Sequence, residues 1–275
     1  MFGPTLRKTM IAALALAAAT AAKAETINVT YVAGHPPVFR WVRLANEVFI
    51  PAVNKQLEGS GHTINWDEQY GGSLAKVGDE LEAVEEGLAE IGGISSVFDP
   101  AKLSLQNVTY YTPFVSSDPS LVVETIDALH ETNEAMLSTW EENGLEYLGG
   151  PIAIDDYILM TTFPVNSIED LKGKKIGAPG PAVNWLEGTG AVGVSGNLTT
   201  YYNEIKTGVY DGVIVFATAA LPGKLHEVAP HITRIGFGAQ YAGAIAANKD
   251  WFDSQPDAVQ KALKDAADTY KAAYL

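Results

Sequence analysis

Hydrophobic and polar positions follow two different periods along the chain from residue 25 onward, and the period changes at regular intervals. Apolar residues that alternate or run together predict strands, whereas apolar residues three or four positions apart predict helices. The first elements predicted in this way are strands at 27–32, 62–70 and 89–94 and helices at 38–57 and 74–87. Strands that alternate with helices indicate a parallel sheet whose faces are covered by the helices.

The second half of the chain repeats this alternation and therefore predicts a second α/β unit. A predicted helix at 118–143 and a strand at 146–154 precede it. A final helix is predicted at 256–275, and no glycine or other stop signal follows it, so we expect the sequence to continue. The elements of the second unit are strands at 157–162, 174–177 and 209–216, helices at 182–188 and 201–206, and a helix-opening capping segment at 167–170.

Together the two units predict an α/β protein of two lobes with a ligand cleft between them. We expect lobe I to span residues 25–154 and lobe II residues 155–238, with residues 239–275 returning to lobe I and starting the C-terminal helix. Crossing strands near Ile152 and 235–238 would join the lobes. Ligands of parallel sheets bind beyond the carboxyl ends of the strands. The loops expected to meet there are 34–35, 71–73 and 95–96.

Residues 1–24 have the pattern of a cleavable secretory signal peptide rather than of a folded element. Arg7 and Lys8 give it a positive start, residues 10–22 form a short apolar segment, and Ala-Lys-Ala at 22–24 is a small-x-small cleavage site. The apolar segment is shorter than the roughly 20 residues that cross a bilayer. We therefore expect export to the periplasm and removal of the signal.

Composition excludes several classes of function. The chain has 18 Lys and Arg against 33 Asp and Glu, and the signal holds three of the basic residues and no acidic one, so cleavage changes the formal charge from −15 to −18. An acidic chain without clustered cations does not suit nucleic-acid binding. The absence of cysteine excludes disulfides, thiolate metal sites and cysteine nucleophiles. A mature chain of about 250 residues is long enough to bury a stable core without disulfides.

Motifs that resemble catalytic signatures lack the surroundings that their chemistry requires. Residues 188–193 match G-x-G-x-x-G, but they follow a predicted helix rather than the strand that a dinucleotide site needs. His226 and His231 are one position too far apart for a zinc-binding H-E-x-x-H helix, and Pro230 interrupts that helix. No nucleophile, base and orienting group come together in the sequence. We expect neither catalysis nor a cofactor or metal site, and an exported hydrolase is the alternative.

Five segments, in order along the chain, resemble segments of TRAP-transporter solute receptors (the DctP family). The most extensive match is residues 164–177, which contain Glu-Asp-Leu-Lys-Gly followed by a lysine and an apolar residue. The others are 71–74, 112–114, 202–212 and 224–228. The resemblance implies two lobes that close around one small ligand and deliver it to a membrane permease of a small and a large subunit. It implies neither cofactor nor chemistry.

The chain departs from those receptors where they hold a carboxylate ligand. An arginine that ends the segment matching 164–177 is replaced here by Gly177. An asparagine that faces the carboxylate falls on Val215, and a further arginine falls on Tyr157. A guanidinium is the group that binds a carboxylate through two parallel hydrogen bonds. The resemblance therefore implies that the usual carboxylate site has been lost.

Aromatic and acidic residues near the expected cleft suggest a different ligand. Aromatic faces beside a carboxylate suit an ammonium group, at ~0.5–2 kcal/mol per cation–π contact. Our hypothesis is a small amine, amino alcohol or other solute without a carboxylate. The alternatives are an organic acid bound by Arg40, Arg43 or Lys76, and a binding protein of an ABC transporter. The candidate ligand-binding residues are His35, Ser95, Ser96, Asp156, Tyr157, Gly177, Asn184, Trp185, Tyr202, Val215 and Phe216.

Overall fold

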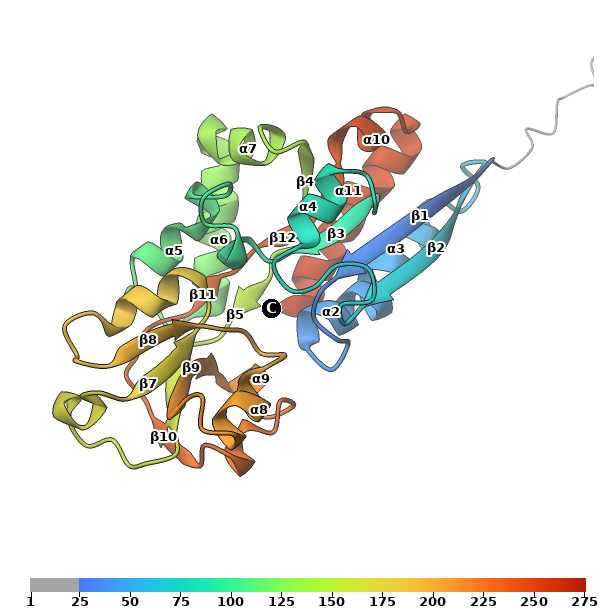
Figure 1. Ribbon diagram of the computed structural model, residues 1–275. Coiled ribbons are helices and arrows are strands. Elements are labelled where there is room, and N and C mark those ends of the chain that lie inside the picture. Colours follow the sequence, from blue (N-terminus) through green and yellow to red (C-terminus); the bar gives the residue numbers. More distant parts are fainter. Residues whose placement is uncertain (1–24) are drawn as a thin grey trace, which may run out of the picture.

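The structure is a computed structural model that describes residues 25–275, so the predicted signal peptide lies outside the described residues. Two five-stranded sheets form two lobes, and a two-stranded sheet lies between them (Figure 1). The α/β architecture predicted from the alternation of strands and helices is confirmed. No helix in the described part of the chain is both long enough and apolar enough to cross a membrane.

The sheet of lobe I mixes parallel and antiparallel pairing. Its central strand β3 pairs in parallel with β1, which in turn pairs in parallel with β2 along nine residues. On its other side β3 pairs antiparallel with β12, and β12 with β4. The order across the sheet is β2 (His62–Tyr70), β1 (Glu25–Ala33), β3 (Ile91–Ile94), β12 (Ala244–Asn248) and β4 (Leu145–Gly149).

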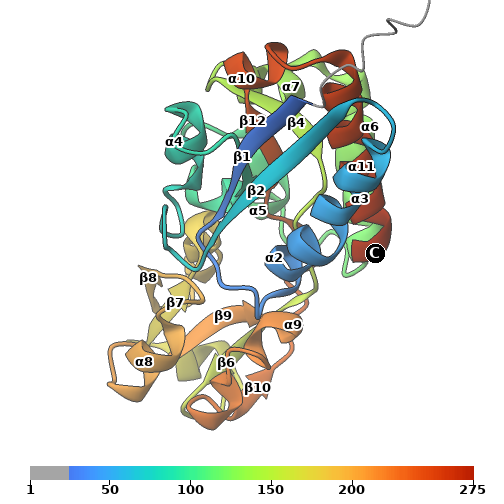
Figure 2. The same ribbon diagram turned by 90° about the vertical axis from the view of Figure 1, so that its right-hand side faces the viewer.

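One face of this sheet is covered by two long helical segments that pack on each other (Figure 2). The first runs through α2 (Arg40–Leu44) and α3 (Ile50–Gln56), with a wider π-helical turn between them. Pro51 lies just after that turn, and its missing amide proton removes one helical hydrogen bond, which accounts for the widening. The second is α11 (Asp257–Tyr274), whose buried stripe contains the predicted apolar positions Val259, Leu263, Ala266 and Ala267.

Three predicted elements of lobe I are shorter than expected. The helix predicted at 118–143 is two helices, α6 (Pro119–Thr132) and α7 (Glu134–Glu141). Asn133 between them is extended, and its side chain accepts a hydrogen bond from the Ala135 amide to cap α7. The strand predicted at 146–154 ends at β4, because Gly149 and Gly150 both adopt positive φ. The helix predicted at 74–87 is reduced to α4 (Glu80–Glu85).

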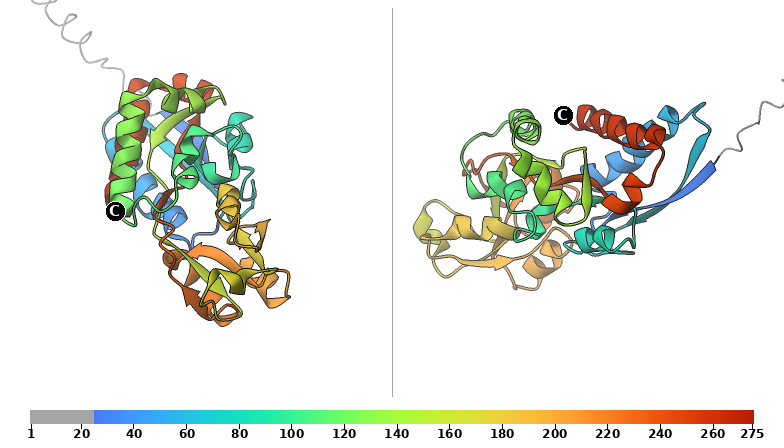
Figure 3. Two further views of the ribbon diagram at one scale, coloured as in Figure 1. Left: turned by 90° about the vertical axis from the view of Figure 1, so that its left-hand side faces the viewer. Right: turned by 90° about the horizontal axis from the view of Figure 1, so that it is seen from above.

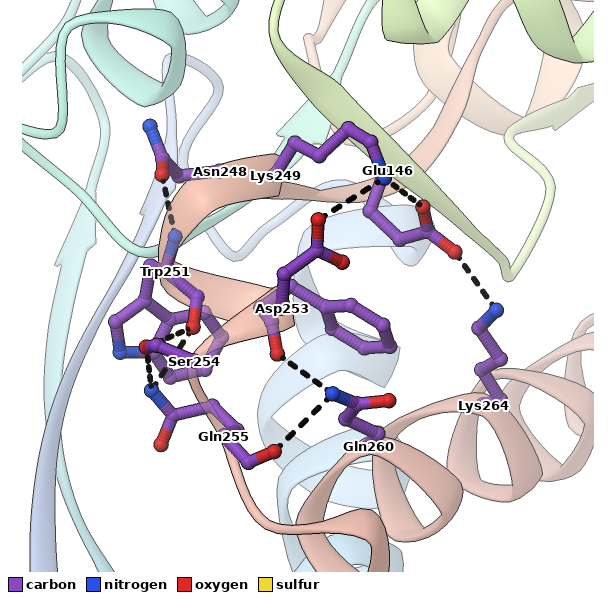
Figure 4. Close-up of polar contacts among 10 residues, drawn as sticks. Glu146, Asn248, Lys249, Trp251, Asp253, Ser254, Gln255, Gln260 and Lys264 are labelled. Carbon is purple, nitrogen blue, oxygen red and sulfur yellow. Dashed lines mark hydrogen bonds and ion pairs between the residues drawn. The ribbon is translucent and has the colours of Figure 1, made fainter.

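A polar network fastens the C-terminal helices to the sheet of lobe I (Figure 4). The Glu146 carboxylate on β4 lies 2.7 Å from the Lys264 ammonium of α11 and 3.5 Å from that of Lys249. Lys249 begins α10 (Lys249–Asp253) and is also 3.2 Å from the Asp253 carboxylate. Asn248 caps α10 by accepting a hydrogen bond from the Trp251 amide. The network fixes α10 and α11 to β4, so lobe I behaves as one packed unit.

The sheet of lobe II has its parallel strands at one side. β7 pairs in parallel with β8 and with β9, whereas β6 pairs antiparallel with β9 and β10. The predicted capping segment is confirmed, because Ser167 and Asp170 make the reciprocal hydrogen bonds of a capping box. The order is β10 (His231–Thr233), β6 (Tyr157–Thr161), β9 (Gly212–Phe216), β7 (Lys175–Ala178) and β8 (Val192–Ser195), flanked by α8 (Tyr201–Lys206) and α9 (Ala217–Ala220).

The chain crosses between the lobes where β5 (Ala153–Ile154) pairs antiparallel with β11 (Gln240–Tyr241). Figure 1 shows this short pair at the junction of the two lobes, and Figure 3 shows the two lobes from two further directions. The outgoing crossing follows Ile152, as predicted, whereas the returning strand lies slightly after the predicted segment 235–238. Two adjacent extended strands leave the lobes free to change their relative angle with small backbone rotations at each end.

Candidate functional site

A narrow cavity of about 30 Å³ lies between the two lobes, at the carboxyl ends of β1 and β3 on one side and of β7, β8 and β9 on the other. This space holds only a few water molecules, so the side chains have closed on one another. Its walls are formed by His35, Trp41, Ser95, Val97, Phe98, Tyr110, Ile152, Ile154, Tyr157, Pro179, Asn197, Leu198, Tyr201, Ile214, Val215, Phe216 and Ala242.

Strand ends place the key side chains in this cavity. β1 ends at Ala33, and His35 follows it; β3 ends at Ile94, and Ser95 follows it. In lobe II, Tyr157 begins β6 directly opposite Phe216 at the end of β9. The cavity therefore lies where open α/β sheets bind ligands, beyond the carboxyl ends of parallel strands.

The cavity carries no formal charge at neutral pH. None of its lining residues, all within the described part of the chain, is Asp, Glu, Lys or Arg. Burial lowers the pKa of His35 to about 3, so its imidazole is neutral. Burial also raises the pKa of the Tyr157 and Tyr201 phenols well above the ordinary value, so both remain protonated. The site is thus aromatic and polar but uncharged.

Several polar atoms of the cavity wall are available to a ligand. The Tyr110 and Tyr157 hydroxyls lie 2.9 Å apart in a buried hydrogen bond, which leaves one of their two protons free. The His35 Nε2 and the Tyr201 hydroxyl have no hydrogen-bond partner among the protein atoms of residues 25–275, although both side chains are buried. A buried polar atom without a partner costs about 1–3 kcal/mol. Both atoms therefore favour an occupant that forms hydrogen bonds with them.

Aromatic contacts hold the two lobes together around the cavity. Trp185 of lobe II donates its indole N–H to the Tyr110 carbonyl oxygen of lobe I at 2.8 Å, and the two rings stack with centroids 5.7 Å apart. Trp185 also stacks on Phe237 at 5.1 Å. On the other side of the cavity Trp41 of lobe I lies 6.0 Å from Phe216 of lobe II. The Trp185–Tyr110 and Trp41–Phe216 contacts bridge the cleft and describe its closed form.

The structure brings five of the predicted site residues together in the cavity wall, namely His35, Ser95, Tyr157, Val215 and Phe216. Trp185 lies behind the wall, edge-on to Tyr157 at 5.4 Å. The residues that do not line the cavity are Ser96, Asp156, Gly177, Asn184, Trp185 and Tyr202.

The predicted residues outside the cavity have other roles. The Asp156 carboxylate accepts a hydrogen bond from the Gly238 amide at 2.8 Å, and the Tyr202 hydroxyl donates to the Glu227 carboxylate at 2.9 Å. Ser96 is fully buried, and Asn184 is exposed.

Gly177 is enclosed by side chains of lobe II. A Cβ atom at this position would lie 2.9 Å from the Tyr210 ring and 3.1 Å from Val213. The space in which an arginine side chain would begin is therefore occupied by the core of lobe II.

Sequence reasoning missed half of the aromatic wall. Trp41, Phe98 and Tyr110 line the cavity but were assigned to no site. Trp41 has a helical spacing that is equally typical of a core residue, and only the meeting of the two lobes distinguishes it. Tyr110 precedes the segment 112–114 that resembles the receptor family, which was the one local signal for its position.

The cations considered as relocated carboxylate ligands do not line the cavity. Arg40 donates to the Ala273 carbonyl oxygen at 3.2 Å and lies 5.0 Å from the centre of the Tyr274 ring. Arg43 lies 3.7 Å from Glu47 on the same helix, and Lys76 is exposed. Residues 25–275 also contain no group of three or more His, Asp or Glu side chains placed to hold a metal ion.

Comparison with known families gives one match. The family model for bacterial extracellular solute-binding protein, family 7 (DctP), matches residues 45–275. A search of curated proteins found no match.

Solved structures of similar fold include an extracytoplasmic solute receptor of Bordetella pertussis that binds pyroglutamic acid, with 18% identity and a TM-score of 0.76 over 90% of this chain and 81% of that one. A TRAP periplasmic solute-binding protein from Sulfitobacter sp., with bound β-D-galacturonate, has 22% identity and a TM-score of 0.76 over 89% and 79% of the two chains. The periplasmic ectoine-binding protein of a TRAP transporter of Halomonas elongata has 23% identity and a TM-score of 0.70 over 90% and 77%.

Proposed function

Because the chain belongs to family 7 of the bacterial extracellular solute-binding proteins, the DctP family of TRAP solute receptors, we propose that it captures one small solute in the cavity between its lobes. Members of this family bind substrates and are not enzymes, so the chain is a receptor. Because the family match covers residues 45–275, it favours a TRAP receptor over the two alternatives, a hydrolase and an ABC-type binding protein.

The uncharged cavity is the observation that carries the proposal on the ligand. A buried carboxylate without a cationic partner costs several kcal/mol of desolvation, and no lining residue among 25–275 supplies a cation. The resemblance to the family aligns Gly177 with the arginine that usually binds a carboxylate, and the Tyr210 ring fills the space beside Gly177. The solute that fits is small, lacks a carboxylate, and forms hydrogen bonds with His35 and Tyr201.

Among solutes without a carboxylate, an uncharged one fits better than an amine. An ammonium group would find aromatic faces, worth about 0.5–2 kcal/mol per contact. Asp156, the one carboxylate among the candidate residues, lies outside the cavity and accepts a hydrogen bond from the Gly238 amide. We therefore propose an uncharged solute as the first ligand class, with a small amine or amino alcohol second.

An organic acid is the competing ligand class. It is favoured by similar solved structures, since the proteins in them bind pyroglutamic acid and galacturonate. It would require Arg40, Arg43 or Lys76 to reach the cavity. In the closed form described here, Arg40 is held by Ala273 and Tyr274, so reaching the cavity would require its release.

The cellular setting follows from the family. TRAP receptors are periplasmic and pass their solute to membrane permease subunits, and we propose the same route for this chain, with residues 1–24 as the cleaved signal peptide. We further propose residues 25–154 as lobe I, 155–238 as lobe II and 239–275 as the return to lobe I. The two main sheets support this division, because the strands of the second sheet all lie between Tyr157 and Thr233.

A thermal-shift screen of the mature receptor tests the ligand class. The panel contains uncharged polyols, amides and lactams, small amines and amino alcohols, and simple mono- and dicarboxylates. A ligand at 1,000 times its Kd stabilises by about 4 kcal/mol, which corresponds to a rise in Tm of about 8–16 °C for a chain of this size. We expect this rise with uncharged solutes. A rise with carboxylates alone would contradict the proposed ligand class, and no rise with any solute would contradict the use of the cavity.

Two neighbouring tyrosines give a matched test of the cavity. Tyr201 lines the cavity with an unpaired hydroxyl, whereas Tyr202 points to Glu227 outside it. Tyr201→Phe removes one hydrogen bond to the solute, worth about 1 kcal/mol, and should raise Kd about fivefold. Tyr202→Phe should leave Kd unchanged. Equal effects of the two variants on Kd would contradict this assignment of the site.

A further inference from the structure

Glu80, at the start of α4, is a carboxylic acid buried just outside the cavity wall. Only 1% of its surface is exposed, whereas Glu82 on the same helix is exposed. Asp and Glu are rarely fully buried unless their oxygens are paired. The contacts of Glu80 therefore indicate what its carboxyl group does.

Both carboxyl oxygens of Glu80 accept hydrogen bonds from backbone segments that lead to the cavity. Oε1 accepts from the Gly34 amide at 3.1 Å, and Gly34 is bonded directly to His35 in the cavity wall. Oε2 accepts from the Gly78 amide at 2.6 Å. Gly78 packs against Phe98, another wall residue, since a Cβ at Gly78 would lie 3.4 Å from the Phe98 Cβ. One side chain thus ties together two parts of the wall.

The wall segment is fitted closely around this contact. A Cβ atom at Gly34 would lie 2.6 Å from Glu80 Oε1 and would overlap the backbone of Val77. The Gly71 amide donates to the carbonyl oxygens of Ala33 and His35, which fixes the other side of the same loop. The position of the His35 imidazole therefore depends on the loop that Glu80 holds.

We propose that Glu80 is a positioning residue of the binding site, whose buried carboxyl group holds the Gly34–His35 wall segment and the Gly78 turn in the geometry that receives the solute. This inference rests on the proposed function in one respect, namely that the cavity wall binds a solute. The hydrogen bonds to Gly34 and Gly78 join groups of the receptor itself, so they can be measured without a solute.

Titration distinguishes this role from simple packing. Burial raises the pKa of Glu80 to about 7, against the opposing effect of its backbone hydrogen bonds, and Asp99 raises it further. The pKa of Asp99 itself is raised to about 6, first by burial; Asp79, Glu82 and Glu85 add to the rise and Lys102 opposes it. His35, behind Gly34, is neutral in this range.

The sign of the effect follows from the raised pKa. If the wall segment opens and water reaches Glu80, the pKa of Glu80 returns toward 4.5. The closed segment therefore binds a proton more tightly than the open one, so a low pH favours the closed segment. The closed segment is most stable below about pH 4.5, and this stability is lost as the pH rises to about 7. Between pH 5 and pH 8 the opening equilibrium should shift about tenfold to a hundredfold toward the open segment.

Amide hydrogen exchange of Gly34 and Gly78 in the ligand-free receptor tests the proposal. After correction for intrinsic exchange rates, wild type should exchange at least about tenfold faster at pH 8 than at pH 5. Glu80→Gln removes the ionisable group and should show no such dependence, whereas the matched variant Glu82→Gln should behave as wild type. Glu80→Ala should accelerate both amides about tenfold or more at either pH, since it removes the acceptor for both.

Three results would overturn the proposal: a flat pH profile in wild type, the wild-type profile retained in Glu80→Gln, or unchanged exchange in Glu80→Ala. If Asp99→Asn abolishes the profile and Glu80→Gln retains it, the effect belongs to Asp99. Where the screen has identified a solute, Glu80→Gln should weaken its Kd at least about fivefold and Glu82→Gln should not. If no solute binds in the screen, the proposed function is contradicted. The exchange test still decides whether Glu80 holds the wall segment, because it needs no solute.

Discussion

Trp185 provides the sharpest test of how the lobes close. Its indole N–H donates to the Tyr110 carbonyl oxygen across the cleft, and its ring stacks on Tyr110 and Phe237. Trp185→Phe keeps most of the stacking and removes the hydrogen bond, worth about 1 kcal/mol. Trp185→Ala also removes the aromatic pair with Tyr110, worth about 0.5–1.5 kcal/mol, whereas its pair with Phe237 lies within lobe II and affects the open form equally. The closed form should lose about 1 kcal/mol in the first variant and about 2 kcal/mol in the second.

Single-molecule fluorescence transfer measures these losses directly. The chain has no cysteine, so one cysteine placed at the exposed Glu58 in lobe I and one at the exposed Lys206 in lobe II can carry the dyes without side reactions. Since 1.4 kcal/mol is a factor of ten, the ratio of closed to open molecules should fall about fivefold in Trp185→Phe. In Trp185→Ala it should fall about thirtyfold.

The matched control is Trp251→Phe, which alters a half-buried tryptophan of α10 within lobe I. It should leave the ratio of closed to open molecules unchanged. A ratio in Trp185→Ala within twofold of wild type would refute the conclusion that Trp185 holds the lobes together.

Two further variants test the cavity and its surroundings through stability. Gly177→Arg should not restore a carboxylate site, because the Tyr210 ring crowds the position of the first side-chain carbon. Denaturation should show that the variant loses about 1–3 kcal/mol or more of unfolding free energy, and stabilisation of the variant by a simple carboxylate would contradict the expectation. For Glu80, the raised pKa predicts that wild type loses about 3 kcal/mol of unfolding free energy between pH 4.5 and 8 relative to Glu80→Gln, most of it by pH 7. Denaturation curves at several pH values check it, and parallel pH profiles of the two proteins would contradict it.

Strongly periodic segments could be predicted from the sequence with good boundaries. The strand at 62–70 and the helix at 201–206 have the predicted limits, because their apolar patterns are local and unambiguous. Asn133 shows where this reasoning fails. Its side chain caps a new helix. The apolar pattern around Asn133 would be the same if the residue lay inside one continuous helix, so the pattern alone could not reveal the break.

The site was less predictable because it is formed by contacts between the lobes. His35 and Ser95 could be placed from the rule that ligands bind at the carboxyl ends of parallel strands. Tyr110 and Trp41 could not, since a buried aromatic residue in the core and one in a closed cleft have the same sequence signature. Asp156 was expected near the ligand, whereas it instead accepts a hydrogen bond from Gly238 at the junction of the lobes.

Isothermal titration calorimetry of the mature receptor tests the central claim, that the cavity between the lobes binds one uncharged solute. With the solute selected by the screen, we expect one binding site per chain and a Kd that Tyr201→Phe raises about fivefold. With a simple dicarboxylate under the same conditions, we expect no binding heat. Binding of the dicarboxylate at one site per chain, weakened by Tyr201→Phe, would show that the uncharged cavity accepts an anion and would contradict the claim.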